Sequence, residues 1–358
     1  MREYGSEFSL ISTDNNKYFT DLFDNTKGHI ELLRSGRDAL GVASDCLPKM
    51  YDLILMPAYC CSSMIKPFSI RKKKIKFYRL NEDLTIDINF LLSIISKYKG
   101  NCVVVVMNFF GASPVNKVVC LIKKQYPDTV IIEDFTHLLF NVNDLSCADI
   151  HIASIRKWIG IPDGAIFFDY MNRFTIRPIE TQDHKFVEKR IKALKNKSIF
   201  YYTNNLQNKL ISRSIFDGCE SVLDKYGKYY LMSSHSMKYL KSYDCSDLIE
   251  KRKFNFFHLY NLIIKNTALR IPINCNHFSS FYVPFSFPLT VNNRDVVQER
   301  LAKKGLFASV LWPISKEAMN TCKNSAYMST HMLSIPIDQR YNAFDIEEIA
   351  EIINGIIS

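Results

Sequence analysis

Residues 149–169, with the sequence DIHIASIRKWIGIPDGAIFFD, organise the whole chain. Two apolar runs, residues 150–155 and 165–168, flank a turn that holds two glycines and one proline. Apolar runs bounded by such residues predict strands, and Lys157 falls where the first strand gives way to the turn. A lysine in this place can meet a ligand. The simpler interpretation is a surface lysine in a hairpin, because lysines are mostly exposed.

The composition is that of an ordinary globular protein, with 358 residues, 47% of them hydrophobic. This length allows two domains, or one large domain with an appendage. No apolar run approaches the roughly 18 to 20 residues that a membrane span needs. The first residues also lack the basic start and apolar core of a secretory signal. We therefore expect a cytoplasmic protein without a membrane partner.

The basic residues outnumber the acidic ones and give a formal net charge of +10, which predicts a surface that attracts anions. Nucleic acid and phosphorylated small molecules are both candidates. Only residues 71–74 form a compact basic run, and no nucleic-acid-binding signature is present, so we expect no nucleic-acid partner. The ten cysteines contain no CxxC pair and no spacing typical of zinc sites, so we expect free thiols and no metal.

The N-terminal half of the sequence alternates between strand and helix patterns. The predicted strands cover residues 52–59, 74–80, 101–110 and 129–135, and the predicted helices cover 62–70, 86–98 and a segment that Ser113 caps with Pro114 in its first position. Continuous apolar runs separated by helices indicate an α/β fold with a mainly parallel sheet between helices. Ligands bind such sheets at the carboxyl ends of the strands.

The C-terminal part mixes the two patterns in a different way. Helices are predicted over residues 248–264, 294–304 and 344–357, and strands over 280–290 and 306–312. This mixture predicts a small α+β domain. We place the large domain at residues 1–240 and the small C-terminal domain at 241–358. The stretch at 171–231 is basic and aromatic and shows no chemical motif.

The segment LLRSGRDAL, residues 32–40, combines a glycine with a helix start. Ser35 and Asp38 have the S-x-x-D spacing of a capping box, which predicts the first turn of a helix. With Gly36 at its start, this helix would present free backbone N–H groups and a positive dipole end. Such a helix start is a ready site for a phosphate.

An acid, a histidine and a lysine meet at the same predicted edge of the sheet. Asp134 ends its strand, His137 follows three residues later, and Lys157 ends the next strand pattern. Each has a simpler role, since Asp134 can cap a helix or form an ion pair and His137 can be a core histidine. Together they favour a pyridoxal 5′-phosphate (PLP) site, in which Lys157 forms the Schiff base and moves the substrate proton, and an aspartate keeps the pyridine nitrogen protonated.

The sequence resembles the DegT/StrS family of fold-type-I, PLP-dependent aminotransferases, best known for aminating nucleotide-linked keto sugars. The segments that carry the resemblance are SGRDAL at 35–40, MPAYCCSS at 56–63, NFFG at 108–111, EDFTH at 133–137, the spacing from Lys157 to Gly164, YVPFSFPLTVNNRD at 282–295 and LSIPIDQRY at 333–341. The resemblance implies a fold-type-I large domain and a homodimer with active sites between subunits.

The resemblance also implies roles for single residues. Lys157 would be catalytic, and the cofactor would be held by Gly36, Arg37, Cys61, Asp134, His137, Ser154 and Lys157 itself. Arg37, Asn108 and Arg340 are candidates for substrate contacts. The implied reaction moves an amino group from an amino acid donor, by family analogy glutamate, to a keto sugar.

The sequence departs from the family pattern at several places. Arg37 replaces a threonine, Cys61 stands where many members place an aromatic residue, and Ala165 replaces a second glycine. The G-x-N-x-R loop that family members lend to the neighbouring subunit is not found. Two alternatives therefore stay open. One is a non-catalytic binding or scaffold protein of the same fold, and the other a PLP-dependent sugar dehydratase, whose known members carry histidine in place of the lysine.

Overall fold

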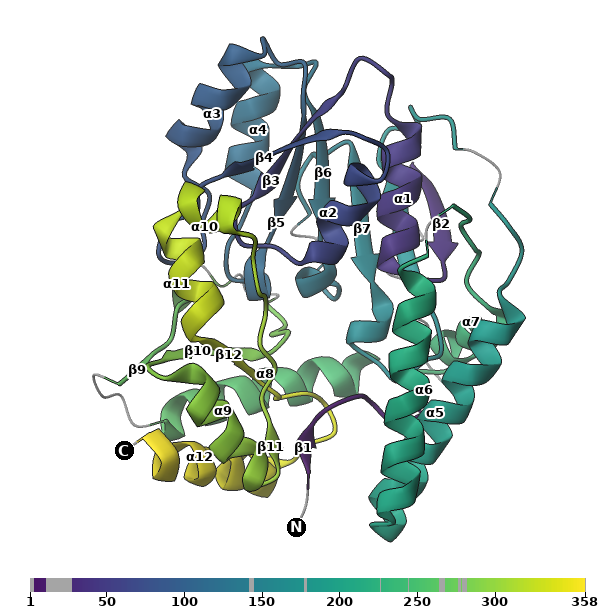
Figure 1. Ribbon diagram of the computed structural model, residues 1–358, viewed down its shortest axis with the longest axis vertical. Helices are drawn as coiled ribbons and strands as arrows, with labels where there is room; N and C mark the ends of the chain where they lie inside the picture. The colour runs from purple at the N-terminus through teal and green to yellow at the C-terminus, as the bar shows by residue number, and fades with distance from the viewer. Residues whose placement is uncertain are drawn as a thin grey trace.

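The centre of the molecule is a seven-stranded sheet in the order β2–β8–β7–β6–β5–β3–β4 (Figure 1). The structure is a computed structural model, and it describes residues 3–10, 28–141, 145–176, 179–225, 227–243, 245–263, 268–275, 278 and 282–357. The strands of the central sheet are β2 (His29–Leu33), β3 (Leu53–Pro57), β4 (Lys74–Tyr78), β5 (Val103–Met107), β6 (Val130–Asp134), β7 (Ile150–Ser154) and β8 (Ala165–Asp169). Strand β8 runs antiparallel to both of its neighbours, β2 and β7, and the other neighbouring pairs in this sheet are parallel.

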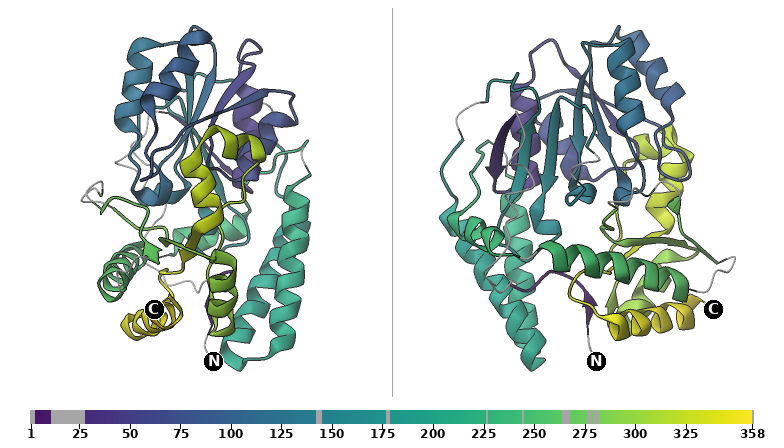
Figure 2. Two further views of the ribbon diagram at one scale, coloured as in Figure 1. Left: turned by 60° about the vertical axis from the view of Figure 1, so that its left-hand side comes forward. Right: turned by 180° about the vertical axis from the view of Figure 1, so that it is seen from behind.

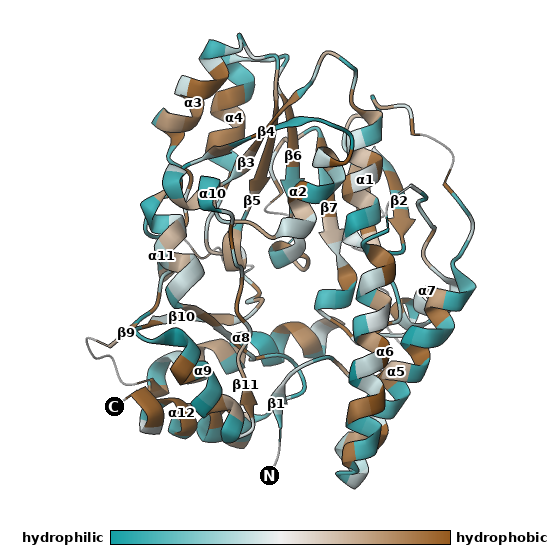
Figure 3. Cartoon of the chain, in the orientation of Figure 1, coloured by the Kyte–Doolittle hydropathy of each residue, from teal (hydrophilic) through white to brown (hydrophobic). Residues whose placement is uncertain are grey.

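The central sheet is covered on both faces. Every residue of β3, β5, β6, β7 and β8 is buried, and Figure 3 shows β3 and β5 as largely apolar segments. Helix α1 (Gly36–Cys46) packs on β7 and β8, and α2 (Ser62–Ser69) packs against α1 and β4. Helices α3 (Ile88–Lys97) and α4 (Asn116–Gln125) stand together at the other end of the sheet (Figures 1 and 2). The predicted α/β fold with a mainly parallel sheet is confirmed.

The C-terminal part builds a smaller sheet below the central one in Figure 1. Its strands, in the antiparallel order β12–β10–β9, are β12 (Met332–Ile335), β10 (Phe287–Val291) and β9 (Leu269–Arg270). The helices of this part are α8 (Cys245–Leu262), α9 (Arg294–Lys303), α10 (Lys316–Thr321), α11 (Lys323–His331) and α12 (Ala343–Ile357). Near the N-terminus, β1 (Tyr4–Gly5) pairs with β11 (Leu306–Phe307). The boundary between residues 240 and 241 stays a prediction.

A long helical hairpin follows the central sheet in sequence and runs down beside the C-terminal part (Figures 1 and 2). It consists of α5 (His184–Thr203) and α6 (Leu206–Leu223), which pack against each other, and the short helix α7 (Ser234–Lys241) comes next. Asn204 adopts the left-handed conformation that ends α5, and the side chain of Asn205 caps α6. Two adjacent asparagines therefore make the sharp turn of the hairpin.

Three local predictions differ from the structure. Ser113 does not cap α4, which starts at Asn116, because the Ser113 amide donates to the side chain of Asn108 at 2.8 Å. The strand expected over residues 306–312 is limited to β11. The pattern missed β2, where only Leu33 is fully buried. Residues 264, 280 and 281 of other predicted elements lie outside the described residues.

None of the helices in the described part of the chain is both long and apolar enough to cross a membrane.

Replacing Ile132 with alanine should lower the free energy of unfolding by about 2–5 kcal/mol, because it leaves a cavity in a close-packed core. Ile132 is fully buried in β6, in the middle of the sheet. Urea denaturation measures the change. The matched control is Ile70→Ala, at a position that is 48% exposed, where we expect a change below about 0.5 kcal/mol. Equal stabilities of the two variants would contradict the packing described here.

Candidate active site

The parallel strands bring the predicted site residues to one edge of the sheet. Strands β3, β5, β6 and β7 all end at this edge, and the register pairs Met107 with Asp134 and Asp134 with Ile152. Cys61 lies just beyond β3, and Asn108 directly follows β5. The edge therefore collects residues from segments that are distant in sequence.

The predicted phosphate turn has the expected local structure. Ser35 is the N-cap of α1, and its hydroxyl accepts a hydrogen bond from the Asp38 amide at 3.2 Å, so the predicted helix start is confirmed. A Cβ on Gly36 would lie 3.4 Å from the Cβ of Ser154, which shows that the start of α1 approaches the end of β7 closely. The structure thus brings together Gly36 and Ser154, two of the predicted cofactor-binding residues.

Lys157 follows β7 in the short helix η5 (Ile155–Lys157), and its side chain is exposed. It does lie in a hairpin, since β7 and β8 are antiparallel neighbours. Within the described ranges its amine has no hydrogen-bond or ion-pair partner. The amine is nevertheless close enough to Asp134 and His137 to influence the pKa of both.

Asp134 is a buried carboxylate at the end of β6. One of its oxygens accepts a hydrogen bond from the Thr136 amide at 2.9 Å. Burial raises the pKa of Asp134, whereas the Lys157 ammonium and the Thr136 hydrogen bonds act in the opposite direction. A buried acid of this kind is suited to a cationic partner.

His137 is fully buried in the short helix η3 (Thr136–Leu138). Its Nδ1 accepts a hydrogen bond from the Phe110 amide at 3.2 Å, and its ring stacks on Phe285 with 4.0 Å between centroids and on Trp312 with 5.8 Å. Burial holds the pKa of His137 well below its ordinary value, and Lys157 lowers it further, so the ring is neutral. The proton then sits on Nε2, which is buried without a hydrogen-bond partner among the described residues.

Arg37 and Cys61 make different contacts from those that the resemblance implies. The Arg37 guanidinium pairs with Glu220 at 2.8 Å and with Asp224 at 3.4 Å, both near the end of α6. Cys61 is the N-cap of α2, and its sulfur accepts a hydrogen bond from the Ser63 hydroxyl at 3.0 Å. Their cofactor-binding roles stay predictions.

The two further candidates for substrate contacts differ in position. The side-chain oxygen of Asn108 accepts the hydrogen bond from Ser113, so this amide has a structural role in the turn after β5. Arg340 pairs with Asp338 at 2.7 Å and lines a large cavity. Of these two candidates, Arg340 alone lines that cavity.

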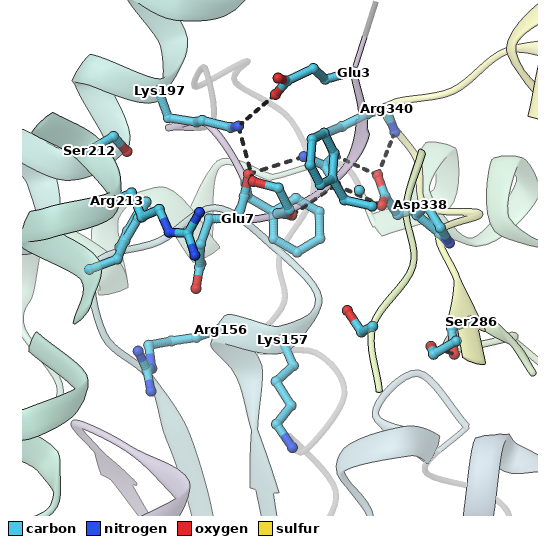
Figure 4. A pocket seen from close by; sticks show the side chains of 18 of the residues that line it. Glu3, Glu7, Arg156, Lys157, Lys197, Ser212, Arg213, Ser286, Asp338 and Arg340 are labelled. Atoms are coloured by element: carbon cyan, nitrogen blue, oxygen red, sulfur yellow. Dashed lines mark hydrogen bonds and ion pairs between the residues drawn. The ribbon is translucent and has the colours of Figure 1, made fainter. Parts of the chain in front are cut away.

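That cavity has a volume of about 680 Å³ and lies between the sheet edge, the α5–α6 hairpin, residues 3–8 and the C-terminal part. Ser154 and Lys157 line it, and Figure 4 shows Arg156 and Lys157 leaving the same turn while Arg213 reaches in from α6. Cationic side chains in its wall outnumber acidic ones by eight to five. Sequence reasoning missed the cations of the hairpin, although the basic helical pattern of α5 was visible.

No three histidine, cysteine or acidic side chains gather as a possible metal site in the part of the chain that the structure describes.

A sheet with one antiparallel strand, a capped glycine turn at its carboxyl edge and a lysine after β7 form the arrangement expected of a fold-type-I aminotransferase. Solved structures of DegT/StrS-type aminotransferases have the same fold as this chain, and the resemblance seen in the sequence is confirmed for the fold. No protein-family model and no curated protein matches the sequence, so the likeness is one of structure.

Three solved structures illustrate this likeness. Helicobacter pylori PseC, an aminotransferase involved in the biosynthesis of pseudoaminic acid, has a TM-score of 0.68 at 11% identity over 99% of both chains. A DegT DnrJ EryC1 StrS aminotransferase from Brucella abortus has a TM-score of 0.62 at 13% identity, over 92% of this chain and 86% of that chain. A Streptococcus pneumoniae protein assigned as a sugar aminotransferase, in its PMP form, has a TM-score of 0.65 at 13% identity, over 96% and 91%.

Asp134→Asn should make the protein without added PLP more stable at pH 7. Asparagine keeps the oxygen that accepts from Thr136 and removes a buried negative charge. Because the pKa of Asp134 is raised, the folded state binds the proton more tightly than the unfolded chain does. Wild-type stability therefore falls as the pH rises from about 4 through the raised pKa, and it stays lower above it.

Urea denaturation between pH 4 and pH 8 measures this difference. The variant should lack the part of the pH dependence that Asp134 contributes. A variant less stable than the wild type at pH 7 would mean that Lys157 stabilises the carboxylate by more than its burial costs.

Proposed function

We propose that this chain is a PLP-dependent aminotransferase. The observation that carries the proposal is the Lys157 amine, which has no partner within the described ranges and lies close to the buried carboxylate of Asp134. This exposed lysine lines the cavity at the carboxyl edge of the sheet, where α/β proteins bind their ligands.

The residues at the sheet edge fit PLP. Gly36 and Ser154 form a close-packed cradle at the start of α1, where backbone N–H groups and the helix dipole favour a phosphate. Asp134 offers a buried acid for the pyridine nitrogen. The unpartnered N–H of His137 at Nε2 supplies a hydrogen-bond donor that a polar cofactor can satisfy.

When bound, PLP supplies an aldehyde that takes up the amino group and a ring that accepts electrons. The Lys157 amine holds the cofactor and then moves a proton at the substrate carbon. The Asp134 carboxylate holds the proton on the ring nitrogen. His137 is neutral and stacks on Phe285 and Trp312, so it positions a donor without adding charge.

The cavity supports a large, anionic acceptor substrate. Its volume of about 680 Å³ exceeds what an amino acid donor needs, and its wall carries an excess of positive charge. We assign glutamate as donor and a nucleotide-linked keto sugar as acceptor. PseC is described as acting in pseudoaminic acid biosynthesis, which agrees with a sugar substrate. A cytoplasmic homodimer completes the proposal.

The contacts of Arg37 and Cys61 favour a second candidate, a non-catalytic protein that keeps the fold. Arg37 is committed to acids of α6, and Cys61 provides no ring to stack on the cofactor. A sugar dehydratase has less support, since Lys157 is a lysine and not the histidine of those relatives.

The purified protein should show a visible absorption band with added PLP, and borohydride should fix the cofactor mass to the peptide that contains Lys157. Lys157→Ala should lose the band and lower any turnover by about 10²–10⁴-fold, because it lacks the proton carrier. The control is Lys124→Ala, an exposed lysine on α4 that should behave as wild type. Retained turnover in Lys157→Ala would refute the assignment.

Glutamate should change the absorption of the PLP-loaded protein as the amino group moves to the cofactor. This half-reaction separates the two candidates, since a scaffold protein binds PLP without converting it. A stopped-flow spectrum at increasing glutamate concentration is the measurement. Succinate, which lacks the amino group, is the matched control ligand. If glutamate and succinate give the same absorption spectrum of the PLP-loaded protein, the non-catalytic candidate becomes the conclusion.

A further inference from the structure

Arg190 of α5 is a buried cation with unsatisfied hydrogen-bonding groups. It is 2% exposed, and its Nε and Nη1 have no hydrogen-bond partner among the described residues. Its ion pair with Glu7 is long, at 3.7 Å, and its guanidinium lies 4.4 Å from the ring centroid of Phe216. A buried charge without good partners is costly, so the position favours a ligand that the described residues do not supply.

Arg190 keeps its charge in spite of this burial. Burial lowers the pKa of Arg190 to about 10, and Arg156 lowers it as well, but this value remains well above neutral pH. The guanidinium is therefore cationic under ordinary conditions. Arg190 lines the cavity, and its guanidinium holds N–H donors in a fixed planar arrangement that suits the oxygens of a phosphate.

Arg213 of α6 lines the same cavity and adds a second available cation. Its exposed side chain has no ion-pair partner within the described ranges, and Figure 4 shows it extending from α6 into the cavity. Three other cations of the wall are already paired with acids. Lys197 and Lys209 share the Glu3 carboxylate, and Arg340 holds Asp338.

We propose that Arg190 and Arg213 form a subsite for the diphosphate of the acceptor substrate, supplied by the chain's own α5–α6 hairpin. Two guanidinium groups from facing helices can each contact one phosphate. The identity of the substrate that carries the diphosphate rests on the proposed function, whereas the anion site itself does not. A carboxylate ligand offers similar oxygen acceptors, so a test of the subsite must distinguish phosphate binding from carboxylate binding.

Glu7 is the group that competes for this subsite. Its carboxylate faces Arg190 from residues 3–8, and Asp217 and Glu220 of α6 line the same cavity. Glu220 is held by Arg37 and Arg156, at 2.8 Å and 3.3 Å. Burial raises the pKa of Glu220, but the neighbouring arginines lower it to about 2. Glu7, as the acid paired with Arg190, is the group that a phosphate would displace from that guanidinium.

Calorimetric titration of the full chain with inorganic pyrophosphate tests the subsite. The titration is done with PLP present and absent, because pyrophosphate could also bind at the start of α1 when PLP does not fill that site. Arg190→Gln and Arg213→Gln should each weaken binding about tenfold, whereas Glu7→Gln should tighten it severalfold. The matched control is Arg300→Gln, an exposed arginine of α9 outside the cavity, which should bind within about twofold of the wild type.

Affinities of Arg190→Gln and Arg213→Gln that equal that of Arg300→Gln would overturn the proposal. Glutarate, a dicarboxylate, should bind more weakly than pyrophosphate, and the reverse order would also overturn it. Arg213 is exposed, so its variant tests the site even where Arg190→Gln fails to fold. Pyrophosphate binding needs no PLP chemistry, so a protein that binds it without an absorption band would keep the subsite and refute the aminotransferase.

Discussion

The antiparallel strand β8 holds two distant parts of the chain at one place. Its first residue, Ala165, pairs with Ser154 at the end of β7 on one side and with Leu33 at the end of β2 on the other. Since α1 starts shortly after β2, this register sets Gly36 against Ser154. Hydrogen bonding within the sheet, more than any contact between polar side chains, therefore places the start of α1 beside the turn that carries Lys157.

The turn between β7 and β8 keeps its shape through Asp163 and Gly164. Gly164 has a φ of +147°, and a Cβ there would lie 3.0 Å from Ile161, so only glycine fits without strain. Asp163 is fully buried and accepts hydrogen bonds from Ser233 and Ser236, which tie the turn to α7. The spacing from the lysine to this acid–glycine pair, which the sequence presents as a family motif, is thus explained by a structural requirement of the hairpin.

Local patterns in the sequence were enough to predict most of the central sheet, because a strand buried on both faces is apolar throughout. The N-cap at Ser35 was also predictable, since it depends on two residues only three positions apart. The start of α4 could not be predicted in this way, because the Ser113 amide donates a hydrogen bond to the Asn108 side chain in the preceding turn. Strand β2 was missed because pairing with β8 creates it, and its own residues are mostly half-buried.

The candidate site shows the same division between local and long-range information. Asp134, His137 and Lys157 could be grouped from sequence because parallel strands end at one edge, so chain order alone gives their neighbourhood. Arg190 could not, because its importance comes from packing that leaves it 2% exposed beside a distant and poorly placed Glu7. A net charge of +10 says that cations are in excess, but only packing decides which of them lacks a partner. Which cations lack an acidic partner is therefore a property of the folded chain. Cations without such partners distinguish a surface that can bind an anion from one that is merely basic.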